Sequence, residues 1–143
     1  MSIRTGEAHW KGALRQGSGT VSTESDQLNS NYGFSSRFES GKGTNPEELL
    51  AAAHAACFSM ALSNELEKKG YIPDEIHTRD KVRLEKSPDG FHITQIEVLT
   101  EATVPRISEN LFKETAEHVK ATCPVSKALA AVEITLTATL KPT

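Results

Sequence analysis

Residues 44–62 of this chain read TNPEELLAAAHAACFSMAL, and the stretch decides the fold because it predicts a long helix with a clear beginning. Thr44 or Asn45 can cap that helix, since the side-chain oxygen of either residue can accept a hydrogen bond from a backbone N–H of the first turn. Pro46 suits the first turn because the N–H that proline lacks would have no partner there. If Thr44 is the cap, Glu47 falls at the third helical position and completes a capping box.

The predicted helix is rich in alanine and apolar on nearly all sides over its first two-thirds. We expect it to run to about Lys69 and to end at Gly70, a residue that accepts the positive φ common at helix C-termini. A helix without a polar face is normally buried on every side. A chain of 143 residues has few ways to surround such a helix, so we expect a homodimer that wraps it.

Three strands are predicted before this helix, over residues 8–14, 19–24 and 32–39, with glycine- and serine-rich turns between them. After the helix, Val82 and Leu84 alternate with charged residues, which predicts a further strand. These strands flank the central helix on both sides in the sequence.

A turn over residues 87–90 leads into the next strand, because proline presets φ and glycine supplies a positive φ there. That strand changes its alternation near Thr94 and Gln95, which predicts a β-bulge. Ser108 is the expected cap of a second long helix, whose inward face is Leu111, Phe112, Ala116 and Val119.

Cys123 and Pro124 open a shorter helix that runs through Leu129, and residues 132–140 alternate as a strand with one buried face. The resulting order is three strands, a helix, two strands, two helices and a strand. This order is an α+β arrangement, and the length favours a single domain over residues 1–143.

Charge and apolar patterning exclude several classes of function. The net charge is −3 and no cluster of Lys and Arg is present, which argues against a nucleic-acid partner. The first residues contain no apolar stretch of a secretory signal. His54 and Ser59 interrupt the central apolar run, which falls short of the roughly 18 residues of a membrane span. We therefore expect a cytoplasmic protein with no membrane partner.

The chain has two cysteines, Cys57 inside the long helix and Cys123 at the start of the shorter one. Either thiol could be a buried packing residue, since free cysteine is among the most buried residue types. Cys57 would need a cation from outside its helix to become reactive, because the thiolate is the nucleophile. At the N-cap, Cys123 would face exposed N–H groups that favour a thiolate.

Arg37 is the natural cation candidate, although a lone arginine is often only a solvated surface residue. Glu47 could orient it through a bidentate pair, and its capping role would also be sufficient to explain it. His54 lies on roughly the same helix face as Cys57 and could act as its base or share a metal with it. We favour a hydrogen-bonded core histidine.

The sequence contains no motif of the common hydrolase, nucleotide or metal sites. A GxSxG elbow, a GxGxxG loop and a phosphate-binding loop are missing. His54, Cys57 and Cys123 supply three zinc ligands at most, without a paired motif, so we expect no metal.

Five segments together resemble the OsmC/Ohr family of thiol-dependent peroxidases, and the resemblance is strongest to its OsmC branch. They are residues 43–62, 8–12, 19–25, 32–39 and the Cys-Pro-Val-Ser motif at 123–126. The resemblance covers essentially the whole chain. Departures fall at turns and exposed helix ends.

The resemblance implies an OsmC-like fold in an intertwined homodimer, in which sheets wrap long central helices and the active site lies at the dimer interface. By the match, Cys57 is the peroxidatic cysteine and Cys123 the resolving one. Arg37 matches the activating arginine, and Glu47, rather than its neighbour Glu48, matches the glutamate that holds it.

The implied reaction reduces organic hydroperoxides, and hydrogen peroxide more weakly, through a sulfenic acid and an intramolecular disulfide. A dithiol of the dihydrolipoyl type would recycle that disulfide, and no metal, haem or flavin would be required. Two alternatives use the same cysteines. One is a redox sensor or binder of small hydrophobic molecules without turnover; the other is a protein whose thiols are simply buried.

Overall fold

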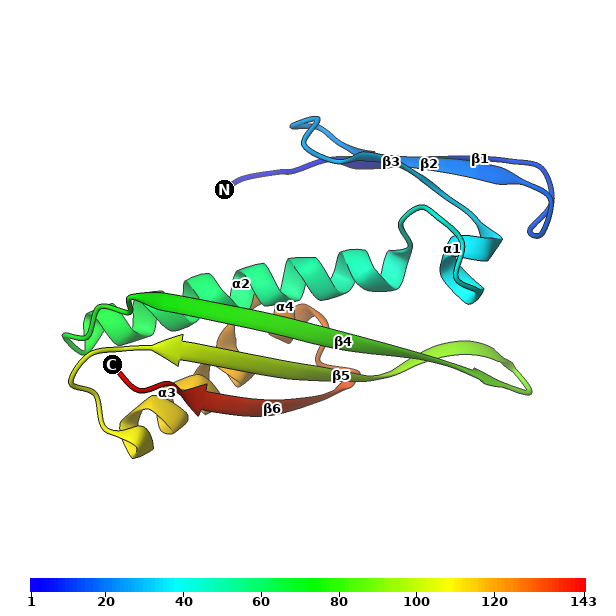
Figure 1. Ribbon diagram of the computed structural model, residues 1–143. Coiled ribbons are helices and arrows are strands. Elements are labelled where there is room, and N and C mark those ends of the chain that lie inside the picture. Colours follow the sequence, from blue (N-terminus) through cyan, green and yellow to red (C-terminus); the bar gives the residue numbers. More distant parts are fainter. The chain divides into compact units, whose positions relative to one another are not determined.

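The computed structural model describes all 143 residues, and the chain divides into two compact units, residues 1–49 and 50–143 (Figure 1). The boundary falls near the start of helix α2 (Pro46–Lys68), so the first turn of this helix belongs to the first unit and the remainder to the second. The single domain over residues 1–143 stays a prediction.

The first unit contains a three-stranded antiparallel sheet in the order β1-β2-β3. Its strands are β1 (Gly6–Lys11), β2 (Ser18–Thr23) and β3 (Asn29–Tyr32). All six residues of β1 are exposed, and only one residue of β2 is buried. The sheet therefore has almost no core of its own, in contrast to the second unit.

The predicted strand over residues 32–39 is wrong, because most of this segment is the short helix α1 (Phe34–Phe38). The hydroxyl of Ser36 accepts a hydrogen bond from the backbone N–H of Gly33 at 3.0 Å, which closes the first turn. The two phenylalanine rings at the ends of α1 pack with their centroids 5.0 Å apart. Local hydrogen bonding by serine therefore outweighs the strand preference of the aromatic residues.

Helix α2 begins with one of the two residues that the sequence offers as its cap. The side chain of Asn45 accepts a hydrogen bond from the backbone N–H of Glu48 at 2.8 Å, so Asn45 is the cap. Thr44 instead donates its hydroxyl to the carboxylate of Glu48 at 2.7 Å. The capping box between Thr44 and Glu47 is therefore not formed, and the Glu47 carboxylate is free to bind another group. Gly70, with φ of +89°, follows the end of α2 as predicted.

The second unit contains α2 beyond its first turn and a three-stranded sheet in the order β4-β5-β6. Its remaining elements are β4 (Glu75–Ser87), β5 (Gly90–Thr103), α3 (Glu109–Thr122), α4 (Pro124–Ala128) and β6 (Glu133–Leu140). β4 and β5 form an antiparallel hairpin, and β6 pairs parallel to β5 after the two helices. The register shift pairs Arg83 with Gln95 and Leu84 with Ile93, which leaves Thr94 as the predicted bulge.

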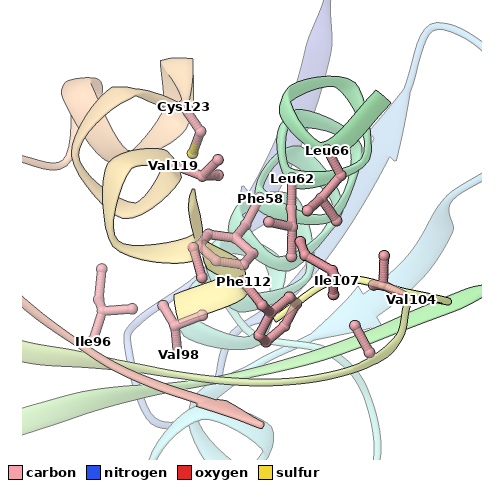
Figure 2. Close-up of a cluster of buried hydrophobic side chains, with 12 residues drawn as sticks. Phe58, Leu62, Leu66, Ile96, Val98, Val104, Ile107, Phe112, Val119 and Cys123 are labelled. Carbon is pink, nitrogen blue, oxygen red and sulfur yellow. The ribbon is translucent and has the colours of Figure 1, made fainter. Parts of the chain in front are cut away.

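The core of the second unit lies between α2, α3 and one face of the sheet (Figure 2). It consists of Phe58, Leu62, Leu66, Ile96, Val98, Ala102, Val104, Ile107, Phe112, Ala116, Val119 and Cys123. Burial of each large apolar side chain is worth about 1.5–3 kcal/mol, so this cluster is the main source of the unit's stability.

The other face of α2 is not covered within one chain. Ala52, Ala53 and Ala56 are exposed, and 78% of Met60 is exposed. Complete burial of α2 is thus not achieved by a single chain. No helix of the structure combines the length and the apolar character needed to cross a membrane.

Candidate active site

The four predicted site residues fall into two pairs, and each pair is brought together within one unit. Arg37 and Glu47 lie in the first unit, and Cys57 and Cys123 lie in the second.

Arg37 on α1 forms a bidentate ion pair with Glu47 in the first turn of α2. Its Nη2 donates to Oε1 of Glu47 at 2.8 Å, and its Nε lies 3.2 and 3.3 Å from the two carboxylate oxygens. The Glu47 side chain is 10% exposed and the Arg37 side chain 35% exposed. A fork of this kind fixes the plane of the guanidinium while the rest of the group still reaches solvent. Glu48, bound to Thr44, is not the residue that pairs with Arg37.

Arg37 also lines a hollow of about 250 Å³ in the first unit. The lining is otherwise mostly apolar and aromatic, and consists of Trp10, Leu14, Tyr32, Gly33, Phe34, Arg37 and Phe38. The guanidinium of Arg37 lies 5.3 Å from the centre of the Phe38 ring. Such a hollow suits a small molecule with an apolar body and a polar end, because the rings bury the body and the cation attracts the polar end.

Cys57 on α2 and Cys123 before α4 are both free thiols, and their side chains interact by a hydrogen bond. Cys123 is 2% exposed and is the N-cap of α4, as predicted. The backbone N–H of Val125 donates to Cys57, and that of Ser126 lies 3.4 Å from Sγ of Cys123. The first turn of α4 therefore gives one N–H to each sulfur, using donors that have no partner inside the helix.

The surroundings of Cys57 raise the pKa of its thiol. Burial is the largest cause, because it disfavours the charged thiolate, and the hydrogen bond and charge of Cys123 raise the pKa further. The N–H of Val125 acts in the opposite direction. These surroundings favour the thiol form of Cys57, and a reactive thiolate needs stabilisation by another group.

His54 on α2 is completely buried and binds two groups other than Cys57. Its Nδ1 hydrogen bonds to the carboxylate of Asp80 on β4, and its Nε2 lies 2.7 Å from Oγ of Ser126. The prediction of a hydrogen-bonded core histidine is confirmed, and the alternative roles as a base toward Cys57 or as a metal ligand beside it are not supported. Oγ of Ser126 lies in turn 3.0 Å from Sγ of Cys123.

Sequence reasoning missed Asp80 and the role of Ser126 in this chain of contacts. Asp80 stands two residues before Val82, so the alternation along β4 places its carboxylate on the inward face of the strand. A carboxylate at an inward position of a strand was therefore the available signal, because buried charges require a partner.

Comparison with known proteins places these residues in a familiar sequence context. The family model described as OsmC-like protein matches residues 39–137. Peroxiredoxin OsmC of Escherichia coli (strain K12) is 52% identical over 139 residues, which cover 96% of either chain. An organic hydroperoxide resistance protein of Xanthomonas axonopodis pv. citri is 32% identical over 99 residues, or 68% of either chain.

The fold is also that of solved structures. The crystal structure of an OsmC-like protein from Mycoplasma pneumoniae superposes with a TM-score of 0.76 at 21% identity and covers 99% of both chains. The predicted α+β OsmC-like fold is thereby confirmed.

Proposed function

The chain belongs to the OsmC-like protein family and is a peroxidase, and we propose that it reduces organic hydroperoxides to alcohols with Cys57 as the attacking thiol. Hydrogen peroxide is the weaker substrate in this proposal. The names of the relatives support it, and so does the mostly apolar hollow beside Arg37, since apolar rings favour an organic peroxide over a small polar one.

The observation that carries the proposal is the contact between Cys57 and Cys123. The two thiols are far apart in the sequence, yet their side chains interact and each receives one N–H from the first turn of α4. Two free thiols whose side chains interact are suited to reversible disulfide formation, because a thiol near a sulfenic acid can attack its sulfur.

In the proposed first step, Arg37 stabilises the thiolate of Cys57, and Glu47 orients Arg37. Support comes from the bidentate pair of Arg37 with Glu47 and from the raised pKa of Cys57, which calls for a cation. The thiolate attacks the terminal oxygen of the hydroperoxide. The O–O bond breaks, an alcohol leaves after taking up a proton, and Cys57 becomes a sulfenic acid.

In the proposed second step, Cys123 attacks the sulfur of that sulfenic acid, so that a disulfide and water form. An external dithiol of the dihydrolipoyl type then reduces the disulfide by exchange. The cycle uses no metal, haem or flavin. We place the protein in the cytoplasm, where reductants keep thiols available for another turnover.

We also propose that the working form is an intertwined homodimer with its sites at the interface. The exposed apolar face of α2, with Ala53, Ala56 and Met60, supports a second copy as its cover, since a surface of this kind gains free energy when buried. Sedimentation of the wild type should give the mass of two chains, and Met60→Asp should shift the equilibrium toward one. A monomeric wild type would contradict this part of the proposal.

The experiment that tests the function is stoichiometric oxidation with cumene hydroperoxide, followed by mass spectrometry of unreduced peptides. We expect one intramolecular disulfide between Cys57 and Cys123 for each peroxide consumed. Persistent free thiols without peroxide loss would contradict the proposal. Repeated turnover with dihydrolipoamide distinguishes the enzyme from a redox sensor, which would stop after one equivalent.

A further inference from the structure

A continuous chain of hydrogen bonds runs through the second unit and ends at the resolving thiol. It begins at Asp80 on β4, passes through His54 on α2 and Ser126 on α4, and reaches Cys123. The side chains of Asp80 and His54 are completely buried, and Ser126 and Cys123 are 3% and 2% exposed. The chain is therefore closed to bulk water along its length.

When Asp80 carries its charge and His54 is neutral, the donors and acceptors run in one direction along this chain. An ionised carboxylate only accepts hydrogen bonds, so Nδ1 of His54 carries the proton that it shares with Asp80. In a neutral imidazole Nε2 then has a free lone pair, which accepts the hydroxyl proton of Ser126. The oxygen of Ser126 is left to accept the S–H of Cys123. Each proton thus points away from the thiol and toward Asp80.

We propose that Asp80, His54 and Ser126 form a proton relay that deprotonates Cys123 in the resolving step, a role that rests on the function proposed above. Ser126 touches the reacting sulfur, whereas His54 and Asp80 are positioning residues that act through it. The relay gives the buried Cys123 a built-in base, in place of the water that a surface thiol would use.

Sγ of Cys123 attacks the sulfur of the Cys57 sulfenic acid, so that an S–S bond forms and the S–O bond breaks. The thiol proton moves to Oγ of Ser126 while the hydroxyl proton of Ser126 moves to Nε2 of His54. The leaving hydroxide takes up one proton, released in the end by the imidazolium, and becomes water. The oxidation state of the Cys57 sulfur falls by one and that of the Cys123 sulfur rises by one, so the two changes cancel and no outside oxidant or reductant is needed.

The same Asp–His–Ser order also occurs in serine hydrolases, but Ser126 is not placed to act on an external substrate. It is almost completely buried, and its oxygen already contacts Sγ of Cys123. A hydrolase serine must instead present its oxygen to the substrate carbonyl. The structure therefore assigns Cys123 as the group that this relay serves.

Asp80 contacts His54 through only one of its two carboxylate oxygens. Its Oδ2 contacts His54, and its Oδ1 is buried without a hydrogen-bond partner.

The titratable groups that face His54 and Ser126 from the packed elements are Asp80 on β4, Cys57 on α2 and Cys123 before α4. Removal of the His54 ring would leave the buried Asp80 unpaired, so Ser126 is the better position to interrupt the relay.

The test uses Ser126→Ala in rapid-quench experiments with one equivalent of cumene hydroperoxide. Dimedone traps the Cys57 sulfenic acid, and mass spectrometry of peptides measures the disulfide separately. We expect disulfide formation to slow by about a hundredfold, the usual scale of a lost general base, with sulfenic acid accumulating in its place. Ser126→Thr, which keeps a hydroxyl, should restore most of the rate.

The pH profile separates proton transfer from a merely structural role. Between about pH 6.5 and 8.5, wild-type disulfide formation should vary by less than about threefold, because the base is part of the fold. In Ser126→Ala the rate should rise nearly tenfold per pH unit below the thiol pKa, because only preformed thiolate can attack. Thr100→Val is the matched control, since the hydroxyl of Thr100 is buried and its hydrogen bonds go to Thr78 and the His77 carbonyl rather than to Asp80, His54, Ser126 or Cys123. It should keep the wild-type profile.

A second variant keeps the test independent of how well Ser126→Ala folds. Asp80→Asn preserves the shape of the side chain but removes the negative charge that supports an imidazolium, so it should also slow the disulfide and steepen its pH profile. Wild-type rates and profiles in both variants would overturn the relay, and so would slowing without a change in profile. A wild type that forms neither sulfenic acid nor disulfide would instead overturn the proposed function itself.

Discussion

Glu47 binds the guanidinium of Arg37, and Asp80 binds the imidazole of His54, but the first pair is open to solvent whereas the second is buried. Glu47 holds Arg37, whose side chain is 35% exposed and lines an apolar hollow. Asp80 holds His54 with both side chains completely buried. The guanidinium is permanently charged, whereas the imidazole can take up and release a proton near neutral pH.

The difference indicates what each pair can do. A fixed charge at an open hollow can attract an external substrate and stabilise a thiolate, but it cannot remove a proton. A buried imidazole cannot meet an external substrate, yet it can move protons between groups inside the protein. We therefore assign the Arg37 pair to attack on the peroxide and the His54 pair to resolution by Cys123.

Cys57→Ser removes the sulfur that attacks the peroxide, and the roles proposed for both pairs depend on that sulfur. It therefore gives the largest expected effect. Peroxide consumption should fall to the background rate, because serine is a far weaker nucleophile than a thiolate. Cys123→Ala is the control, and it should still consume one equivalent of cumene hydroperoxide and stop at the sulfenic acid. Undiminished turnover in Cys57→Ser would remove the basis for assigning a role to either pair.

The two pairs should also differ in their contribution to stability. His54→Ala leaves the buried Asp80 without a partner, and we expect the free energy of unfolding to fall by about 3–5 kcal/mol. Glu47→Gln disturbs a partly exposed pair, and the loss should be below about 1 kcal/mol. Urea unfolding monitored by circular dichroism measures both. Equal losses would mean that burial does not make the Asp80–His54 pair more important for stability than the Arg37–Glu47 pair.

Arg37→Ala should slow formation of the sulfenic acid by about a hundredfold, the scale of losing one group that stabilises a developing charge. Burial already raises the pKa of Cys57, and loss of the cation should raise it further, so less thiolate is present at neutral pH. The pH profile of iodoacetamide labelling should therefore move to higher pH. Arg37→Lys keeps the charge without the fork and should lie between the two, whereas an unmoved profile in Arg37→Ala would exclude Arg37 as the activator.

The smallest expected effect concerns the contact between the two thiols. After burial, the hydrogen bond and charge of Cys123 are the causes that raise the pKa of Cys57, so Cys123→Ala should lower this pKa without restoring its ordinary value. A lower pKa means more thiolate at any pH below it, and labelling of Cys57 at neutral pH should become a few times faster. Slower labelling would show that Cys123 stabilises the thiolate instead.

Local signals in the sequence predicted much of the fold correctly. The caps Asn45 and Ser108, the glycine after α2 and the bulge at Thr94 each depend on a few neighbouring residues, and the structure has all four. Helix α1 was missed because the hydrogen bonds of Ser36 decide its conformation against the strand preference of its aromatic residues. The incorrect strand prediction assigned Arg37 to a strand instead of helix α1, but Arg37 was still identified as the candidate cation.

The site was predicted less completely, because its contacts join distant segments. Resemblance to a family singled out Cys57 and Cys123, and their interaction could not be derived from helix signals alone. His54 was noticed for its place near Cys57, but its partners Asp80 and Ser126 come from another strand and another helix. Only tertiary packing brings these three side chains together.

We propose that the Arg37 pair acts in the attack on the peroxide and the His54 pair in disulfide formation. The most direct test is a rapid-quench experiment that follows sulfenic acid and disulfide separately in Arg37→Ala and Ser126→Ala. The account predicts that Arg37→Ala slows the appearance of sulfenic acid, whereas Ser126→Ala lets sulfenic acid accumulate and slows only the disulfide. If both variants slow the same step, the two pairs do not serve different halves of the reaction.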